Sequence, residues 1–157
     1  MLINKRVLLI DDNEAVTGYL REELMNSADY QVSVVSTAGQ GVAVFTQESF
    51  DMVIAKYGLA DLAGAHLVQE LRKVDPDCMI VAILETADQE VLKEAHGLGL
   101  FDFVTVPLNI EKLLFLVKKG IELRAIVSNA RKQILSLQEQ NTSLQKKNVM
   151  MAKRIEE

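Results

Sequence analysis

The stretch RVLLIDDNEAVTGYL (residues 6–20) contains the pattern from which the fold is predicted. Its first five residues form an apolar-rich run, which is typical of a strand buried on both faces of a parallel sheet. The run ends at Asp11 and Asp12, and the apolar residues Val16 and Leu20 then follow four residues apart, which indicates one face of a helix. A buried strand, a polar turn and an amphipathic helix together predict the first half of a βαβ unit.

Four further short apolar runs predict strands along the first two-thirds of the chain. They lie at residues 31–35, 51–55, 79–84 and 101–106, and helical spacings and glycines separate them. Five buried strands that alternate with helices predict an α/β fold, a doubly wound five-stranded parallel sheet with right-handed connections. The composition, with 49% hydrophobic and 25% charged residues, is ordinary for a globular protein.

The last third of the chain follows a different pattern. From Asn109 to Glu157 there is no proline, one glycine and no strand pattern, and core-type residues recur at alternating spacings of three and four. This repeat predicts a coiled coil, which extends the last helix. The expected seam consists of Leu123, Val127, Ala130, Ile134, Leu137, Asn141, Leu144, Asn148, Met151 and Ile155.

Two seam positions indicate how the helices pair. Asn141 and Asn148 both take a positions, where a buried Asn is tolerated best opposite its twin in a two-stranded parallel coil. We therefore expect residues 1–122 to form the globular domain and residues 123–157 to form a parallel homodimer. One long helix that packs on its own domain remains the alternative.

The net charge of −5 conceals two parts of opposite charge. From Lys118 onward nine Lys and Arg residues face four Asp and Glu, whereas the preceding residues carry eight against eighteen. An acidic body disfavours nucleic acid, and the basic tail is interpreted as a solvated helix face that could also contact an acidic partner.

No apolar run approaches the roughly 20 residues of a membrane span, and no signal peptide is recognised. Since Cys78 is the single cysteine, no internal disulfide is expected, and the predicted compartment is the cytoplasm.

Several enzyme classes are disfavoured by missing motifs. The sequence has no G-x-G-x-x-G after a strand and no G-K-[ST], so neither a dinucleotide site nor a P-loop is expected. Ser-His-Asp and metal-binding His/Cys spacings are also missing. His66 and His96 lie in predicted helices of the body and are interpreted as ordinary residues. The coiled-coil segment has no histidine, which argues against a phosphoacceptor dimerisation helix.

The strand and helix pattern of the first two-thirds of the chain resembles the receiver domains of response regulators, the CheY-like family with a flavodoxin-like fold. The opening stretch is similar to the family's first strand, its acidic pair for a metal and its first helix. FDMVIAKYGLADLAGAHLVQELRK (residues 50–73) is similar to the third strand, loop and helix, and GLGLFDFVTVPL (residues 97–108) to the fifth strand and its proline. The resemblance extends to about Arg124. It implies that Phe103 is the switch aromatic and that the Val106–Pro107 bond is cis.

The resemblance fails at the phosphorylation site. The phosphoacceptor Asp corresponds to Lys56, the active-site Lys to Val106 and, when the chain is counted without gaps, the switch Ser or Thr to Leu84. Of the catalytic positions only Asp11 and Asp12 remain. Phosphoryl transfer to a carboxylate needs that nucleophile, a divalent cation and donors for the developing charge, whereas Lys56 is cationic at neutral pH. We expect its ammonium to lie against the acidic pair in place of Mg²⁺, so that the site needs no cofactor and binds Mg²⁺ weakly at most.

These expectations describe a signalling module without catalytic activity. We expect this module to dimerise and to contact an unidentified signalling protein or a downstream domain. The resemblance implies that its contact surface consists of its fourth helix, fifth strand and fifth helix. The first alternative is an N-terminal regulatory piece of a longer cyclase, phosphodiesterase or kinase. The second is a phosphorylatable receiver with an unorthodox site, in which Thr86 would become the switch residue by a shift of two. Asp51 and Asp61 are expected to lie too far from Asp11 to replace the phosphoacceptor.

Overall fold

A five-stranded parallel sheet forms the centre of the fold, in the strand order β2-β1-β3-β4-β5. The computed structural model describes residues 4–85 and 88–156, with side chains up to residue 154. The strands are β1 (Lys5–Ile10), β2 (Tyr30–Val35), β3 (Met52–Lys56), β4 (Ile80–Leu84) and β5 (Asp102–Thr105). The helices that alternate with them are α1 (Glu14–Ser27), α2 (Ala38–Gln47), α3 (Gly64–Val74), α4 (Gln89–Gly97) and α5 (Ile110–Glu156). The predicted α/β fold with a parallel sheet is therefore confirmed.

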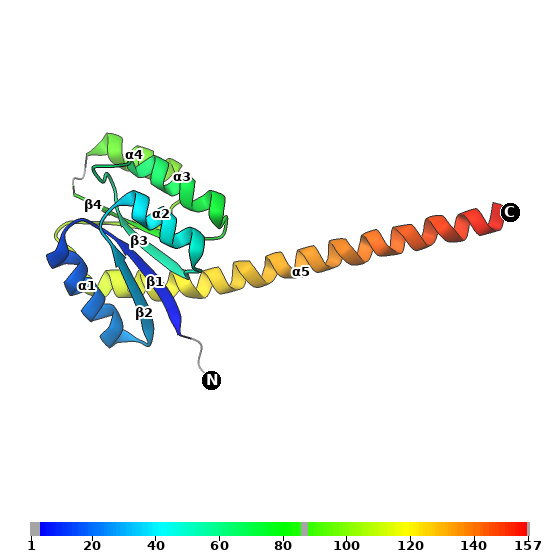
Figure 1. Cartoon of the computed structure of the whole chain (residues 1–157), viewed down its shortest axis with the longest axis horizontal. Helices are drawn as coiled ribbons and strands as arrows, with labels where there is room; N and C mark the ends of the chain where they lie inside the picture. The colour runs from blue at the N-terminus through cyan, green and yellow to red at the C-terminus, as the bar shows by residue number, and fades with distance from the viewer. Residues whose placement is uncertain (1–3, 86–87, 157) are drawn as a thin grey trace. The chain divides into compact units, whose positions relative to one another are not determined.

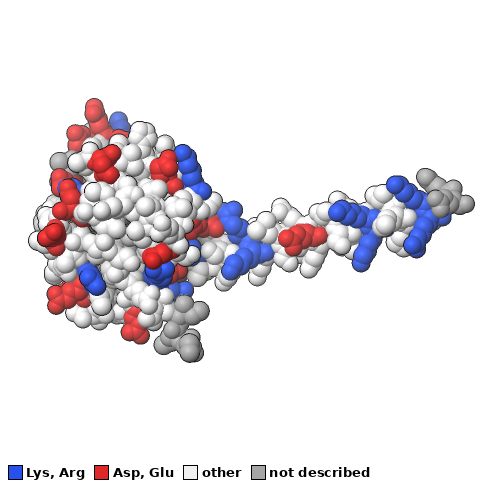
Figure 2. All heavy atoms as spheres, in the orientation of Figure 1, with Lys and Arg blue, Asp and Glu red and all other residues white. Residues whose placement is uncertain are grey.

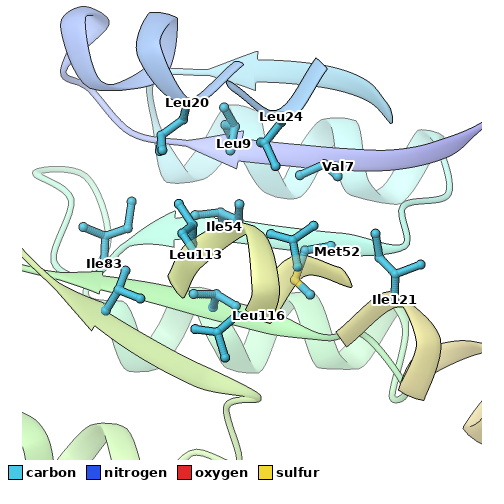
Figure 3. Close-up of a cluster of buried hydrophobic side chains, with 13 residues drawn as sticks. Val7, Leu9, Leu20, Leu24, Met52, Ile54, Ile83, Leu113, Leu116 and Ile121 are labelled. Carbon is cyan, nitrogen blue, oxygen red and sulfur yellow. The ribbon is translucent and has the colours of Figure 1, made fainter. Parts of the chain in front are cut away.

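Helices cover both faces of this sheet (Figure 1). Along β1, Val7 and Leu9 point to one face and Leu8 and Ile10 to the other, because successive strand residues alternate. On the first face these side chains pack against α1 and the first part of α5, as the close-up in Figure 3 shows. On the second face they pack against α2 and α3. Burial of each such side chain contributes about 1.5–3 kcal/mol to folding.

The contacts within the chain divide it into two units, Met1–Arg124 and Ala125–Glu157. The first part of α5 belongs to the first unit, where it fits closely on the sheet. Gly120 lies against Met52 and Phe101, and a Cβ atom at this position would overlap the Met52 side chain. Glycine therefore lets α5 approach the sheet, at the usual cost of a glycine in a helix.

The amino-terminal side of β3 is held by an ion-pair network within the first unit. Arg124 Nη1 lies 3.3 Å from Asp51 Oδ1, and its Nη2 lies 2.8 Å from Asp75 Oδ2. The backbone N–H of Arg6 also donates to Asp51 Oδ2 at 2.9 Å. Asp51 precedes β3 and Lys56 ends it, so the strand lies one residue later than the predicted 51–55.

The second unit consists of the remainder of α5. Most of its apolar seam side chains are exposed in the single chain, for example Ile134 at 56%, Leu137 at 60% and Met151 at 62%. Figure 2 shows that acidic side chains are spread over the first unit and that basic ones gather along this helix. Within residues 4–85 and 88–156, no helix is both long and apolar enough to cross a membrane.

Candidate functional site

The candidate site lies where β1, β3 and β4 end. Asp11 and Asp12 follow β1, Lys56 is the last residue of β3, and Glu85 follows β4. These strands are neighbours in a parallel sheet, so their carboxyl ends lie along one edge, which is where open α/β sheets form their ligand sites.

Lys56 is the centre of this cluster. Its Nζ lies 3.0 Å from Asp12 Oδ1 and 2.9 Å from Glu85 Oε1, and its side chain is 15% exposed. The predicted ion pair between Lys56 and the acidic pair is therefore present, with Asp12. Hydrogen bonds to Glu85 and to Asp12 raise the pKa of Lys56 above its ordinary value, so this side chain is an ammonium at neutral pH.

The two carboxylates of the acidic pair have different environments. Asp12 is exposed, and its hydrogen bond from Lys56 lowers its pKa. Asp11 is 6% exposed, and burial raises its pKa, although the backbone N–H of Asn13, which donates to Oδ1 at 2.9 Å, opposes this shift. The Asn13 side chain in turn accepts the N–H groups of Ala15 and Val16 and caps α1. The cap fixes the turn that carries both acids.

Leu84, which the resemblance places at the switch position, is the last residue of β4. Its side chain is 1% exposed. Ile83 is in register with Lys56, and side chains two apart on a strand share a face, so the next residue that reaches the site is Glu85. Thr86, the other switch position considered, lies outside the described residues.

Glu85 is a residue of the candidate site that the sequence did not single out. The signal available for it was an acidic residue directly after an apolar strand, the same signal that singled out Asp11.

Val106 follows β5 and lines the pocket beside Lys56, and Phe103 lies within that strand. Val106 is 52% exposed, and the Val106–Pro107 bond is cis as predicted. Phe103 is half-buried, and its ring meets the His96 ring edge-on, with centroids 5.3 Å apart at 85°. His96, interpreted from the sequence as an ordinary residue, thus contacts the expected switch aromatic.

The two other acids considered as substitutes have structural partners elsewhere. Asp61 accepts the N–H groups of Ala38 and Gly39 at 3.1 and 2.9 Å, which caps α2 and lowers the pKa of Asp61. Asp51 is bound to Arg124, as described above. Neither acid is available to take the place of the phosphoacceptor.

The donor set does not fit Mg²⁺ well. Mg²⁺ prefers oxygen ligands in near-octahedral geometry, but a lysine ammonium is hydrogen-bonded to Asp12, one of the two carboxylates that would bind it. Among the side chains that the structure describes, no group of three or more His, Cys, Asp or Glu residues is placed to hold a metal ion.

The comparison with known proteins gives the family. Residues 7–118 match the response regulator receiver domain, which is well over half of the chain. The chain belongs to the response regulator receiver family. A receiver domain is a module of two-component signalling that interacts with other signalling proteins, and this coarse function holds for the chain.

Individual members of the family are distant from this receiver. It is 20% identical to sporulation initiation phosphotransferase F of Bacillus subtilis over 124 residues. This match covers 79% of this chain and 99% of that protein. It is 26% identical to a response regulator receiver protein of Anaeromyxobacter sp. over 110 residues. This match covers 70% of this chain and 46% of that protein. Its fold matches the solved structure of an adenylate cyclase from Rhodopirellula baltica with a TM-score of 0.77 at 19% identity, over 84% of this chain and 98% of that one.

The seam residues form a second candidate site. Leu123 is 40% exposed and Leu144 56% exposed, and Asn141 and Asn148 are exposed as well. Ile155 lies in α5, but its side chain is outside the described residues.

Proposed function

We propose that this receiver acts without phosphorylation, as a module that signals through protein contacts and has no catalytic activity. The observation that carries the proposal is the Lys56 ammonium, which occupies the end of β3 and binds Asp12 and Glu85. A phosphoryl group would need a carboxylate nucleophile there, and the ammonium is a poor nucleophile because it has no free electron pair.

The neighbours of Lys56 also oppose phosphoryl transfer. The transferred group is stabilised by cations and hydrogen-bond donors at its oxygens. Glu85 presents a carboxylate instead, which repels those oxygens, and Val106 offers no charge. The local charge therefore disfavours a phosphorylated state even if another nucleophile were supplied.

The test is phosphorylation by a small-molecule donor. The unaltered chain, incubated with acetyl phosphate and Mg²⁺, should show no mass increase that hydroxylamine removes. Stoichiometric phosphorylation that hydroxylamine reverses would overturn the proposal. A phosphorylatable receiver treated in the same way shows that the donor and the assay work.

We further propose that the second unit pairs with a second copy in parallel. The repeat places exposed apolar side chains on one stripe of α5, and such a stripe is buried when two helices pair. Four of the positions that flank the seam carry glutamine, namely Gln133, Gln138, Gln140 and Gln145, and others carry basic residues such as Arg131 and Lys147. The two Asn residues of the seam then supply the register.

The partner surface proposed for the first unit is formed by α4, β5 and the first part of α5. The contact between His96 of α4 and Phe103 of β5 supports it, because this contact joins two elements of that surface. A partner that binds there would be sensitive to the position of the Phe103 ring.

A second candidate function is regulation of a longer signalling enzyme. It is favoured by the Anaeromyxobacter relative, of which this chain covers 46%, and by the fold match to a protein named as an adenylate cyclase. Sequencing of the reading frame beyond Glu157 distinguishes the two candidates. A cyclase, phosphodiesterase or kinase domain in frame would establish the second one.

A further inference from the structure

A pocket of about 430 Å³ opens beside Lys56. Its walls are mainly apolar and come from Val16 and Tyr19 of α1 and from Val106 and Leu108 between β5 and α5. Small-molecule sites have volumes of roughly 300–1,000 Å³, with apolar walls and a few convergent polar groups. The pocket therefore has the size and the walls of a site for a small organic molecule.

One end of the pocket contains the carboxylate of Asp11, which Lys56 attracts from nearby without forming a salt bridge with it. Asp11 lines it and is 6% exposed, and Oδ1 accepts the N–H of Asn13 at 2.9 Å. The nearby ammonium of Lys56 donates to Asp12 and Glu85 instead. Within residues 4–85 and 88–154, no Lys or Arg forms a salt bridge with Asp11.

The charge around this end of the pocket is negative. Asp11, Asp12 and Glu85 supply three carboxylates, and Lys56 supplies one ammonium. Val106 stands where the resemblance places a lysine, so a second cation is replaced by an apolar wall. An anion would face the Asp11 carboxylate, whereas a cation would offset the excess negative charge.

We propose that this pocket binds a small amphipathic amine, whose ammonium donates to Asp11 and whose apolar body lies against Tyr19, Val106 and Leu108. A primary ammonium has three donors, which suits a carboxylate that forms no salt bridge of its own. A hydrated divalent cation suits the site less well, because apolar walls cannot hydrogen-bond the water that Mg²⁺ retains. The inference rests on the pocket and holds whether or not the chain dimerises or accepts a phosphoryl group.

The test is a titration of the isotope-labelled full chain with three six-carbon probes, followed by the amide signals of Asn13, Val106 and Leu108. n-Hexylamine should produce saturable shifts at these amides, and hexan-1-ol and hexanoate should bind at least tenfold more weakly. Asp11→Asn should weaken n-hexylamine binding at least tenfold. Val106→Lys, a change at an exposed side chain that keeps Asp11, should do the same through charge repulsion.

Glu22→Gln is the matched control, since it removes an exposed acid of α1 outside the pocket and should leave the affinity unchanged. Equal affinity for n-hexylamine and hexan-1-ol would overturn the proposal. Shifts confined to other amides, or an affinity that neither Asp11→Asn nor Val106→Lys changes, would overturn it as well.

Discussion

Glu85 Oε1 lies 2.9 Å from Lys56 Nζ, and this ion pair joins the residue after β4 to the last residue of β3. The same ammonium reaches Asp12, the second residue after β1, at 3.0 Å. One cation thus connects the ends of three adjacent strands, at the position that the resemblance assigns to the family's phosphoacceptor. Because both partners of Lys56 are largely exposed, the pairs contribute little free energy each, but they set the charge of the site.

Lys56→Ala should lower the free energy of unfolding by about 1 kcal/mol, because it leaves the carboxylates of Asp12 and Glu85 without their cation. Urea unfolding measures this change. The same variant should bind Mg²⁺ more tightly in a calorimetric titration, since the competing ammonium is gone. Lys73→Ala is the control, because it removes an exposed ion pair with Glu70 on α3 and should change neither quantity appreciably. An unchanged Mg²⁺ affinity in Lys56→Ala would show that the ammonium does not compete with a metal.

Lys56→Asp alone should improve Mg²⁺ binding and yet accept little phosphate from acetyl phosphate. The triple variant Lys56→Asp, Glu85→Thr and Val106→Lys should accept substantially more, because it removes the repelling carboxylate and adds a hydroxyl donor and a cation. Intact mass before and after hydroxylamine measures both. If the single variant were phosphorylated as fully as the triple one, Glu85 and Val106 would have no part in suppressing the reaction.

Lys56, Val106 and Glu85 show what the sequence can and cannot place. The correspondences of Lys56 and Val106 follow from the resemblance to the receiver family, and Pro107 marks the second of them in the sequence. The sequence of β4 contains no residue that indicates which side chains face the site. Residues 80–84 are all apolar and buried, so the alternation of polar and apolar residues that distinguishes the two faces of a strand is missing. The sequence therefore does not indicate which residue at the end of β4 contacts Lys56, and in the structure that residue is Glu85. The long last helix was recognisable from its spacing, whereas its partner is not encoded in contacts within one chain.

Gly120→Ala should destabilise the protein by about 1–3 kcal/mol, because the added methyl group overlaps the Met52 side chain and pushes α5 from the sheet. Gly18→Ala is the matched control in α1, where the added Cβ has no neighbour within 4 Å apart from the adjoining residues and backbone of its own helix, and it should stabilise by roughly 0.5–1 kcal/mol. Urea unfolding of both variants measures the difference. A neutral Gly120→Ala would show that Met52 can move aside freely.

Asp61→Ala should lower the melting temperature at pH 7 and have a smaller effect in acid. The N–H groups of Ala38 and Gly39 lower the pKa of Asp61 below its ordinary value of 3.8, so the carboxylate form stabilises the folded state. This contribution is complete above the unfolded-state pKa and is lost as the pH falls through the lower folded-state pKa. Melting curves from pH 7 to pH 2 should therefore converge for the two proteins. Asp29→Ala, at an exposed position, should track the unaltered protein throughout.

Asn141→Val together with Asn148→Val should raise the melting temperature and broaden the oligomer distribution. Each Asn in the proposed seam leaves polar groups that only an opposite Asn satisfies, so the pair disfavours antiparallel and trimeric packings at some cost in stability. Valine removes that cost and the preference with it. Sedimentation at micromolar concentration should show one dimeric species for the unaltered chain and several species for the double variant. Asn129→Val lies outside the seam and should leave the dimer intact. If the unaltered chain sedimented as a strict monomer at these concentrations, the parallel coiled coil would be contradicted. The exposed apolar stripe of α5 would then need another partner.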